Sequence, residues 1–111
     1  MKTLLTLLTC LFILLPNVVL SETMDDLVYR DWIVYKKFSD VPFTGKTTGK
    51  TQATFRNGER HGPYAIYYDN GQLLVKGIYK NGLKDGIWDF YYDNGQLEEK
   101  ILFKNGVTVK K

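Results

Sequence analysis

The fold is decided by residues 57–104, which read NGERHGPYAIYYDNGQLLVKGIYK and then NGLKDGIWDFYYDNGQLEEKILFK. When 57–80 is placed over 81–104 without a gap, 12 of the 24 positions are identical. A third copy begins at Asn105-Gly106. A fixed period of this length is typical of repeat proteins, in which each copy is one structural unit that stacks on the next.

Each copy contains two Asn-Gly pairs flanked by residues that favour strands. Asn-Gly is a strong hairpin signal, because both residues tolerate the positive φ of a type I′ turn. We therefore expect the chain to run up and down as an antiparallel β-meander that forms a single elongated, twisted sheet. The expected two-residue turns are Asn57-Gly58, Asn70-Gly71, Asn81-Gly82, Asn94-Gly95 and Asn105-Gly106.

The spacing of these turns predicts which side chains share a face of the sheet. Two-residue turns place even-numbered residues of one strand beside odd-numbered residues of the next. One face then collects Tyr64, Ile66, Tyr68, Leu73, Val75, Tyr79, Trp88, Phe90, Tyr92, Leu97, Ile101 and Phe103, with Glu99 as its charged exception. The opposite, wetter face collects Ala65, Tyr67, Leu74, Lys76, Ile78, Asp89, Tyr91, Glu98, Lys100 and Leu102, and there Asp89 and Lys100 are expected to be cross-strand partners.

Two details of the hairpins depend on this register. A three-residue turn with a glycine bulge at 69–71 is locally allowed, but it reverses the parity and scatters the apolar set, so the two-residue turn is favoured. The register also pairs Tyr64 with Gly77, and we expect the glycine to leave room for the tyrosine ring across the strand.

The flanks of the two full copies are expected to complete the array. Residues 22–42 are predicted to form a capping hairpin, with Arg30-Asp31 at its turn, and 43–111 the repeat domain. Within that domain we distinguish a contracted copy at 43–56, full copies at 57–80 and 81–104, and a truncated copy at 105–111. The truncated copy supplies a last edge strand that its lysines protect.

These residues resemble a known family. The stretch VPFTGK at 41–46 and the recurring YYDNGQL and KNGLKDG are similar to the bacterial MORN-repeat variant proteins, often labelled YwqK-type antitoxins. The resemblance covers about residues 25–106. It implies an extended array of β-hairpins that binds proteins or lipids, and its label implies partnership with a toxin.

The first 21 residues predict export. Lys2 is the only charge before Glu22, an apolar run extends from Leu4 to Leu15, and Pro16 breaks it ahead of Ser21. This pattern is typical of a cleaved secretory signal peptide, with the cut after Ser21, although a retained membrane anchor is the alternative. We therefore predict a secreted or periplasmic protein, and such a leader counts against a cytosolic antitoxin.

Composition excludes several classes of function. The chain beyond residue 21 carries 14 basic and 12 acidic residues and no cysteine, because Cys10 lies in the leader. This charge is too small and too interspersed for a nucleic-acid partner, and disulfides are excluded. His61, Asp25-Asp26 and Glu98-Glu99 form no catalytic or metal-ligand pattern, so we predict no enzyme activity, no cofactor and no metal.

The remaining candidates for function are on the wetter face. Tyr67 and Tyr91 occupy equivalent places beside Lys76 and Lys100, where they would seat a peptide or stack on a sugar. The alternative is that the tyrosines only pack along the sheet. We predict a non-catalytic module that binds a protein partner. Cell-wall glycan binding, association with anionic lipid, the antitoxin role and a homodimer through the apolar face are the alternatives.

Overall fold

A computed structural model describes residues 21–109, and this part of the chain is all-β apart from one short turn of helix. The predicted cut after Ser21 thus falls at the start of the described part, and the rest of the expected leader lies outside it. The elements are β1 (Ser21–Thr23), the 3-10 helix η1 (Met24–Asp26), β2 (Leu27–Arg30), β3 (Ile33–Lys36), β4 (Gly45–Thr48), β5 (Thr51–Gln52), β6 (Thr54–Arg56), β7 (Glu59–Arg60), β8 (Gly62–Tyr67), β9 (Leu73–Lys80), β10 (Leu83–Tyr91), β11 (Leu97–Lys104) and β12 (Val107–Thr108).

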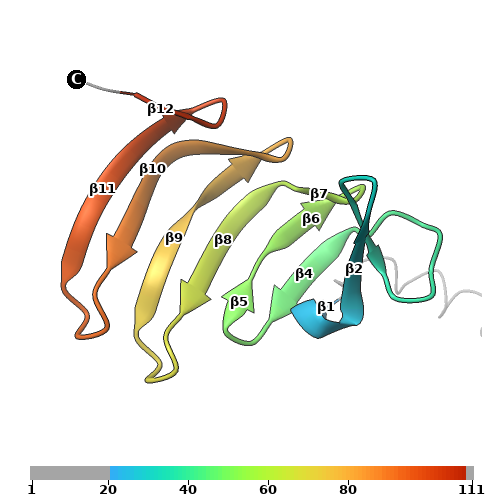
Figure 1. The fold of residues 1–111 in the computed structure, drawn as a ribbon, viewed down its shortest axis with the longest axis horizontal. Coiled ribbons are helices and arrows are strands. Elements are labelled where there is room, and N and C mark those ends of the chain that lie inside the picture. Colours follow the sequence, from blue (N-terminus) through green and yellow to red (C-terminus); the bar gives the residue numbers. More distant parts are fainter. Residues whose placement is uncertain (1–20, 110–111) are drawn as a thin grey trace, which may run out of the picture.

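From β4 to β12 the strands lie side by side in chain order as a curved array, which confirms the expected β-meander (Figure 1). β1 departs from this order, since it pairs in parallel with β4. The strands form three hydrogen-bonded sheets where one was expected. These have the orders β12-β11-β10-β9-β8-β5, β1-β4-β6-β7 and β2-β3. The first two are nearly continuous. The stretch 51–56 contains β5 of the first sheet and β6 of the second, and the stretch 59–67 contains β7 of the second and β8 of the first.

Three of the five predicted turns have the expected type I′ geometry. Asn57, Asn81 and Asn105 have φ of 51°, 50° and 52°, and the glycines that follow them have φ of 82° to 84°. The amides of these glycines donate hydrogen bonds to carbonyls in the preceding unit. Gly58 N–H donates to Phe43 O, Gly82 N–H to Arg60 O and Gly106 N–H to Lys84 O, at 2.8 to 2.9 Å. The turns therefore stack on one another and hold successive copies together.

The prediction of two-residue turns at the other two Asn-Gly pairs is wrong. Tyr68 N–H donates to Gln72 O across a loop of three residues, and Gly71 has φ of 88° while Asn70 does not have positive φ. Tyr92 and Gln96 enclose the same loop in the next copy. This is a type I turn closed by a glycine in the left-handed region.

The predicted register nevertheless holds, because a second irregularity cancels the first. In the hairpin of β8 and β9, Tyr67 pairs with Leu73, but Ile66 pairs with Val75, so Leu74 is an extra residue in β9. From there onward the register is the expected one, and Tyr64 pairs with Gly77. The placement of Leu74 on the wetter face is wrong, since it packs against the buried cluster of apolar residues on the other side.

A two-residue shift also recurs once per copy. β10 pairs with β9 as Asp85 with Ile78 near the turn and as Asp89 with Lys76 further along. The chain accommodates the shift at Gly86, which has φ of 78° and is equivalent to Gly62 with φ of 114°. Because the shift is even, it changes the register without exchanging the two faces of the sheet.

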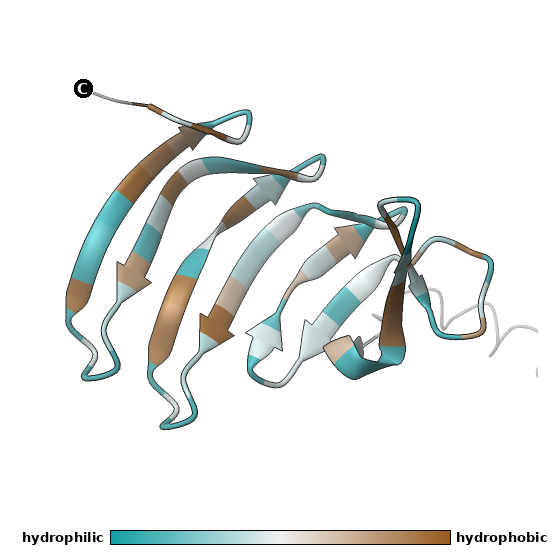
Figure 2. Cartoon of the chain, viewed as in Figure 1, coloured by the Kyte–Doolittle hydropathy of each residue, from teal (hydrophilic) through white to brown (hydrophobic). Residues whose placement is uncertain are grey.

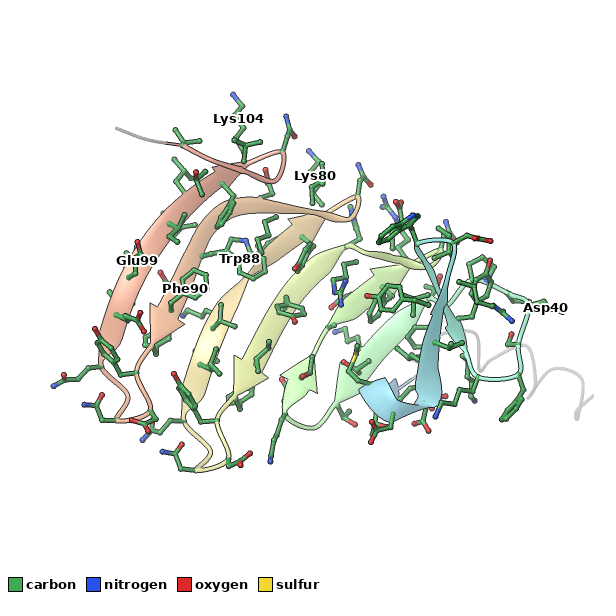
Figure 3. The ribbon with its side chains drawn as sticks, viewed as in Figure 1. Asp40, Lys80, Trp88, Phe90, Glu99 and Lys104 are labelled. Carbon is green, nitrogen blue, oxygen red and sulfur yellow. The ribbon has the colours of Figure 1, made fainter. Side chains whose placement is uncertain are left out.

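Trp88 is the centre of the core of the larger sheet. It is 1% exposed, and its ring makes edge contacts with Tyr79 and Phe103 at centroid distances of 5.0 and 6.2 Å. The indole N–H donates to Ile78 O at 3.1 Å. Trp88 lies over the middle of the sheet (Figure 3). Gly77 lies directly beneath its ring, since a Cβ there would be 2.1 Å from Cδ2 of Trp88. Gly77 therefore makes room for the ring of Trp88 and not, as expected, for that of Tyr64.

A second core lies under the N-terminal hairpin of β2 and β3. It consists of Leu27, Val34, Phe43, Ala53 and Phe55. Tyr64 packs against both this cluster and the one around Trp88, so the two cores are linked through one side chain. The colouring in Figure 2 shows the apolar residues distributed along the whole array rather than gathered at one end.

The apolar face is covered in part by packing within this one chain, around Val75, Trp88 and Phe103. The homodimer through that face stays a prediction. Among residues 21–109, no helix is long and apolar enough to cross a membrane.

Candidate functional site

The wetter face carries a row of residues, all polar except Ala65, that crosses five strands of the six-stranded sheet. Backbone pairing places Gln52 opposite Ala65, Ala65 opposite Lys76, Lys76 opposite Asp89, and Asp89 opposite Lys100. We call these five residues the polar row. The ammonium group of Lys100 lies 2.8 Å from Oδ1 of Asp89, which confirms the predicted cross-strand pair.

A second row on the same face is apolar, and we call it the apolar row. Pro63 pairs with Ile78, and Ile87 pairs with Leu102. Backbone pairing places Asp85 opposite Ile78, so Ile78 and Ile87 are linked by lining the same groove and not by direct pairing. Ile78, Ile87 and Leu102 are 52%, 59% and 43% exposed. Aliphatic side chains that are half exposed and aligned across a sheet form a contiguous patch of the kind found at interaction surfaces.

A groove of about 480 Å³ lies over these two rows at the side nearest β4. Its walls include Gln52, Ala65, Lys76 and Asp89 of the polar row and Pro63, Ile78 and Ile87 of the apolar row. Lys46 and Thr54 close it on the side of the smaller sheet. Lys46 and Lys76 make no ion pair among residues 21–109, so the groove combines an apolar floor with two available cations.

The structure separates the four residues predicted as a binding site. Lys76 lines the groove, and Lys100 borders it through its pair with Asp89. Tyr67 lines a different, shallower hollow of about 410 Å³ with Tyr68, Leu74 and the turn residues that follow. Tyr91 is half-buried, and its carbonyl accepts a hydrogen bond from the hydroxyl of Tyr68 at 2.7 Å. The tyrosines and lysines therefore do not form one site.

Ile87, Lys46 and Pro63 are groove residues that the sequence analysis did not select. The parity rule places Ile87 on the same face as Asp89 and Tyr91, so a signal for it was present. Lys46 had no such signal, because it reaches the groove from a strand outside the full copies.

The groups considered for catalysis have structural roles or stand apart. Nδ1 of His61 accepts a hydrogen bond from the backbone N–H of Asn81 at 3.1 Å, which fastens one copy to the turn of the next. Asp26 accepts hydrogen bonds from the backbone N–H and the hydroxyl of Thr23 at the start of η1, and these contacts hold its pKa below the usual value. Across residues 21–109 no group of three or more His, Cys, Asp or Glu side chains is arranged to hold a metal.

Two tyrosines and one lysine give the fold a dependence on alkaline pH. Burial raises the pKa of Tyr64 and Tyr79, and Arg60 opposes the effect. The hydrogen bond to Asp89 raises the pKa of Lys100. Unfolding lets the tyrosines ionise at their ordinary pKa, near 10.0, and the stability from the lysine pair is lost as pH rises through the raised pKa of Lys100.

We therefore expect the contribution of these groups to the stability of the fold to be fully present at neutral pH and to fall above about pH 10. Urea unfolding measured from pH 7 to 11 checks this expectation. A variant with Tyr64→Phe and Tyr79→Phe should show a smaller alkaline loss, because it has no buried phenol to ionise. A loss centred between pH 7 and 9 would contradict the assignment to these groups.

Comparison with curated proteins and with solved structures found no significant match. A family comparison did match, over two stretches that repeat the 24-residue period. They cover the glycine bends at Gly62 and Gly86 and most of both rows, and each ends at the asparagine of a stacked turn, Asn81 or Asn105. Repeats of the MORN type are generally modules that bind proteins or lipids. The assignment to the YwqK-type proteins stays a prediction. Residues 60–81 and 84–105 each match the MORN repeat variant, so this part of the chain is a pair of MORN-type repeats.

Proposed function

We propose that the chain is an exported, non-catalytic binding module that holds a protein partner in the groove of the wetter face. The observation that carries this proposal is the exposure of the apolar row directly beside the polar row. Apolar area supplies most of the free energy of association, while the charged row fixes orientation and partner choice. The groove is open and shallow, which suits a chain segment lying across the strands.

The N-terminal strand is compatible with export. Ser21 of β1 pairs with Lys46 of β4, and a carboxylate oxygen of Glu22 lies 2.8 Å from the ammonium group of Lys36. Cleavage after Ser21 removes the Ser21–Lys46 pairing and leaves Glu22 as the first residue, with its backbone pairing to Thr47 and its ion pair to Lys36 intact. Expression with a C-terminal tag, fractionation and intact mass test this part of the proposal. A full-length cytosolic product that crosslinks to a toxin would overturn it and favour the antitoxin role.

Replacing Ile87 by aspartate is expected to weaken partner binding at least tenfold. A partner that covers Ile87 buries the 59% of the residue that is exposed, worth about 1–2 kcal/mol, and a carboxylate at the same place must be desolvated instead. Tenfold corresponds to about 1.4 kcal/mol. Because Ile87 is more than half exposed, the substitution should leave the stability of the fold within about 0.5 kcal/mol.

The measurement is photocrosslinking in the cell envelope, with a photoreactive residue at position 78 in chains with and without Ile87→Asp. The crosslinked product should fall at least tenfold in the Ile87→Asp chain. Leu97→Asp is the matched control, since Leu97 is also exposed but does not line the groove. Equal losses in both variants, or equal products from a photoreactive residue placed at Asp93, would reject the groove as the binding surface.

A further inference from the structure

Arg60 of β7 lies inside a box of four aromatic rings at the turn end of the array. Its guanidinium carbon is 5.5 to 5.8 Å from the ring centroids of Tyr29, Phe55, Tyr64 and Tyr79. These rings come from β2, β6, β8 and β9, so four strands enclose one cation. Contacts at this distance are cation–π interactions, and they fix the position of the guanidinium group.

The guanidinium group has no anionic partner in the described part of the chain. Residues 21–109 contain no ion pair to Arg60, and its Nε–H is buried without a hydrogen-bond acceptor. Buried polar groups are nearly always hydrogen-bonded, so an exception requires an explanation. At the equivalent position of the next copy the chain has Lys84, whose ammonium group lies 5.0 Å from the ring centroids of Trp88 and Phe103. A lysine is therefore sufficient to cover the aromatic face.

A hollow of about 300 Å³ opens beside Arg60, lined also by Tyr29, Trp32, Leu83 and the turn residues Gly58 and Gly82. Arg60 is the only cation among the residues that line it. Glu59 lines it as well, but its carboxylate lies toward Gly82 of the next turn and forms no ion pair with Arg60. Lys80 and Lys104 lie at the same turn edge of the molecule (Figure 3).

Trp32, which lines this hollow, combines a left-handed backbone conformation with an exposed side chain. Asp31 and Trp32 have φ of 52° and 70°, so they form a turn like the stacked Asn-Gly turns, but with a tryptophan where those have glycine. The left-handed conformation costs a residue with a side chain about 1–2 kcal/mol. The residue is nevertheless 91% exposed, so no packing inside the described chain offsets this cost. A strained, exposed aromatic residue beside an unpaired guanidinium group points to a ligand.

We propose that the hollow receives a carboxylate of the protein partner, carried by a segment whose neighbouring ring or aliphatic side chain packs on Trp32 and Tyr29. The guanidinium group offers a planar pair of donors that matches a carboxylate, and its single charge matches a single carboxylate. The orphaned Nε–H gains an acceptor in the complex. This proposal rests on the proposed function and adds a second contact region to the groove.

The test uses the full chain labelled with 15N and a small probe, N-acetylphenylalanine, with N-acetylphenylalanine amide as the neutral control. The chain has three arginines, Arg30, Arg56 and Arg60, so the Nε–Hε signals are few and can be assigned by substitution. We expect the carboxylate probe to shift the Nε–Hε signal of Arg60 and the indole N–H signal of Trp32 in a saturable manner. The amide should bind at least tenfold more weakly.

Arg60→Gln should abolish the response, and Arg30→Gln, a charge loss remote from the hollow, should retain it. Because Arg60→Gln also removes contacts to four rings, Trp32→Gly provides a second, independent variant. It relieves the strained turn, so its melting temperature should rise while its affinity for the probe falls at least threefold. Equal responses to probe and amide, or no shift of the Arg60 signal with either, would overturn the proposal.

Failure of this proposal is distinguishable from failure of the proposed function. Ile87→Asp should leave the response to the probe unchanged, since Ile87 does not line the hollow. If photocrosslinking at position 78 succeeds while the probe has no effect, the groove stands and the hollow is rejected. If the probe binds Arg60 but no partner crosslinks, the hollow is an anion site and the role of the groove is rejected.

Discussion

Gly77→Ala should lower the free energy of unfolding by about 3 kcal/mol, the upper end of the usual cost of overpacking. The added Cβ would lie 2.1, 2.2 and 2.5 Å from three atoms of the Trp88 ring. The ring cannot move aside cheaply, since it is buried between its aromatic neighbours and its indole N–H is bonded to Ile78 O. Urea unfolding followed by circular dichroism measures the loss.

Two further variants separate this clash from other effects of replacing a glycine. Gly71→Ala has open space around the new methyl group but a φ of 88°, so it should cost only the backbone strain of about 1–2 kcal/mol. In a double-mutant cycle, Gly77→Ala should be far less costly in a Trp88→Leu background, because the ring it meets is absent. Additive effects in that cycle would show that the clash is not the cause.

Trp88→Ala should lower the free energy of unfolding by about 3–5 kcal/mol, the cost of removing a large buried aromatic side chain. The substitution leaves a cavity between β9, β10 and β11 and removes the contacts to Tyr64, Tyr79 and Phe103. Since Tyr64 also packs on the N-terminal core, we expect the loss to reach that part of the array. Hydrogen exchange of amides in β9 to β11 and in β6 reports both effects.

The chain supplies its own control in Trp32, its second tryptophan. Trp32 is 91% exposed on left-handed backbone, so Trp32→Ala removes no buried area and should change stability by less than about 0.5 kcal/mol. Equal losses from the two substitutions would contradict the assignment of Trp88 as the centre of the core.

The period and the Asn-Gly pairs were enough to predict the meander, three of its turns and the assignment of most side chains to a face, but not the two-residue shift of register at Gly86. The turn prediction failed at Asp69-Asn70-Gly71 and at its repeat, where two departures from the expected hairpin occur, each of one residue. The turn has one residue more than expected, which alone would exchange the two faces of the next strand. The extra residue at the Leu74 bulge restores the expected faces. A leucine is apolar on either face, so the sequence carries no sign of that bulge.

The candidate sites were harder to predict than the fold. Lys76 and Lys100 follow from parity, because neighbours across a strand pair are set by the turns. Arg60 does not, since the four rings around it come from Tyr29, Phe55, Tyr64 and Tyr79, which are far apart in the chain. The prediction of a turn at Arg30-Asp31 is wrong by one residue, because Arg30 pairs with Ile33 and the turn is Asp31-Trp32.

The stacking of copies also places equivalent side chains at regular intervals along the array. Each copy adds two strands, and neighbouring strands are about 4.8 Å apart, so equivalent side chains recur about every 9–10 Å along the array. An extended peptide advances about 3.3 Å per residue, so one that lies across the strands meets equivalent positions, such as Lys76 and Lys100, at every third residue. The length of partner that the chain can bind is thus counted in steps of three residues per copy.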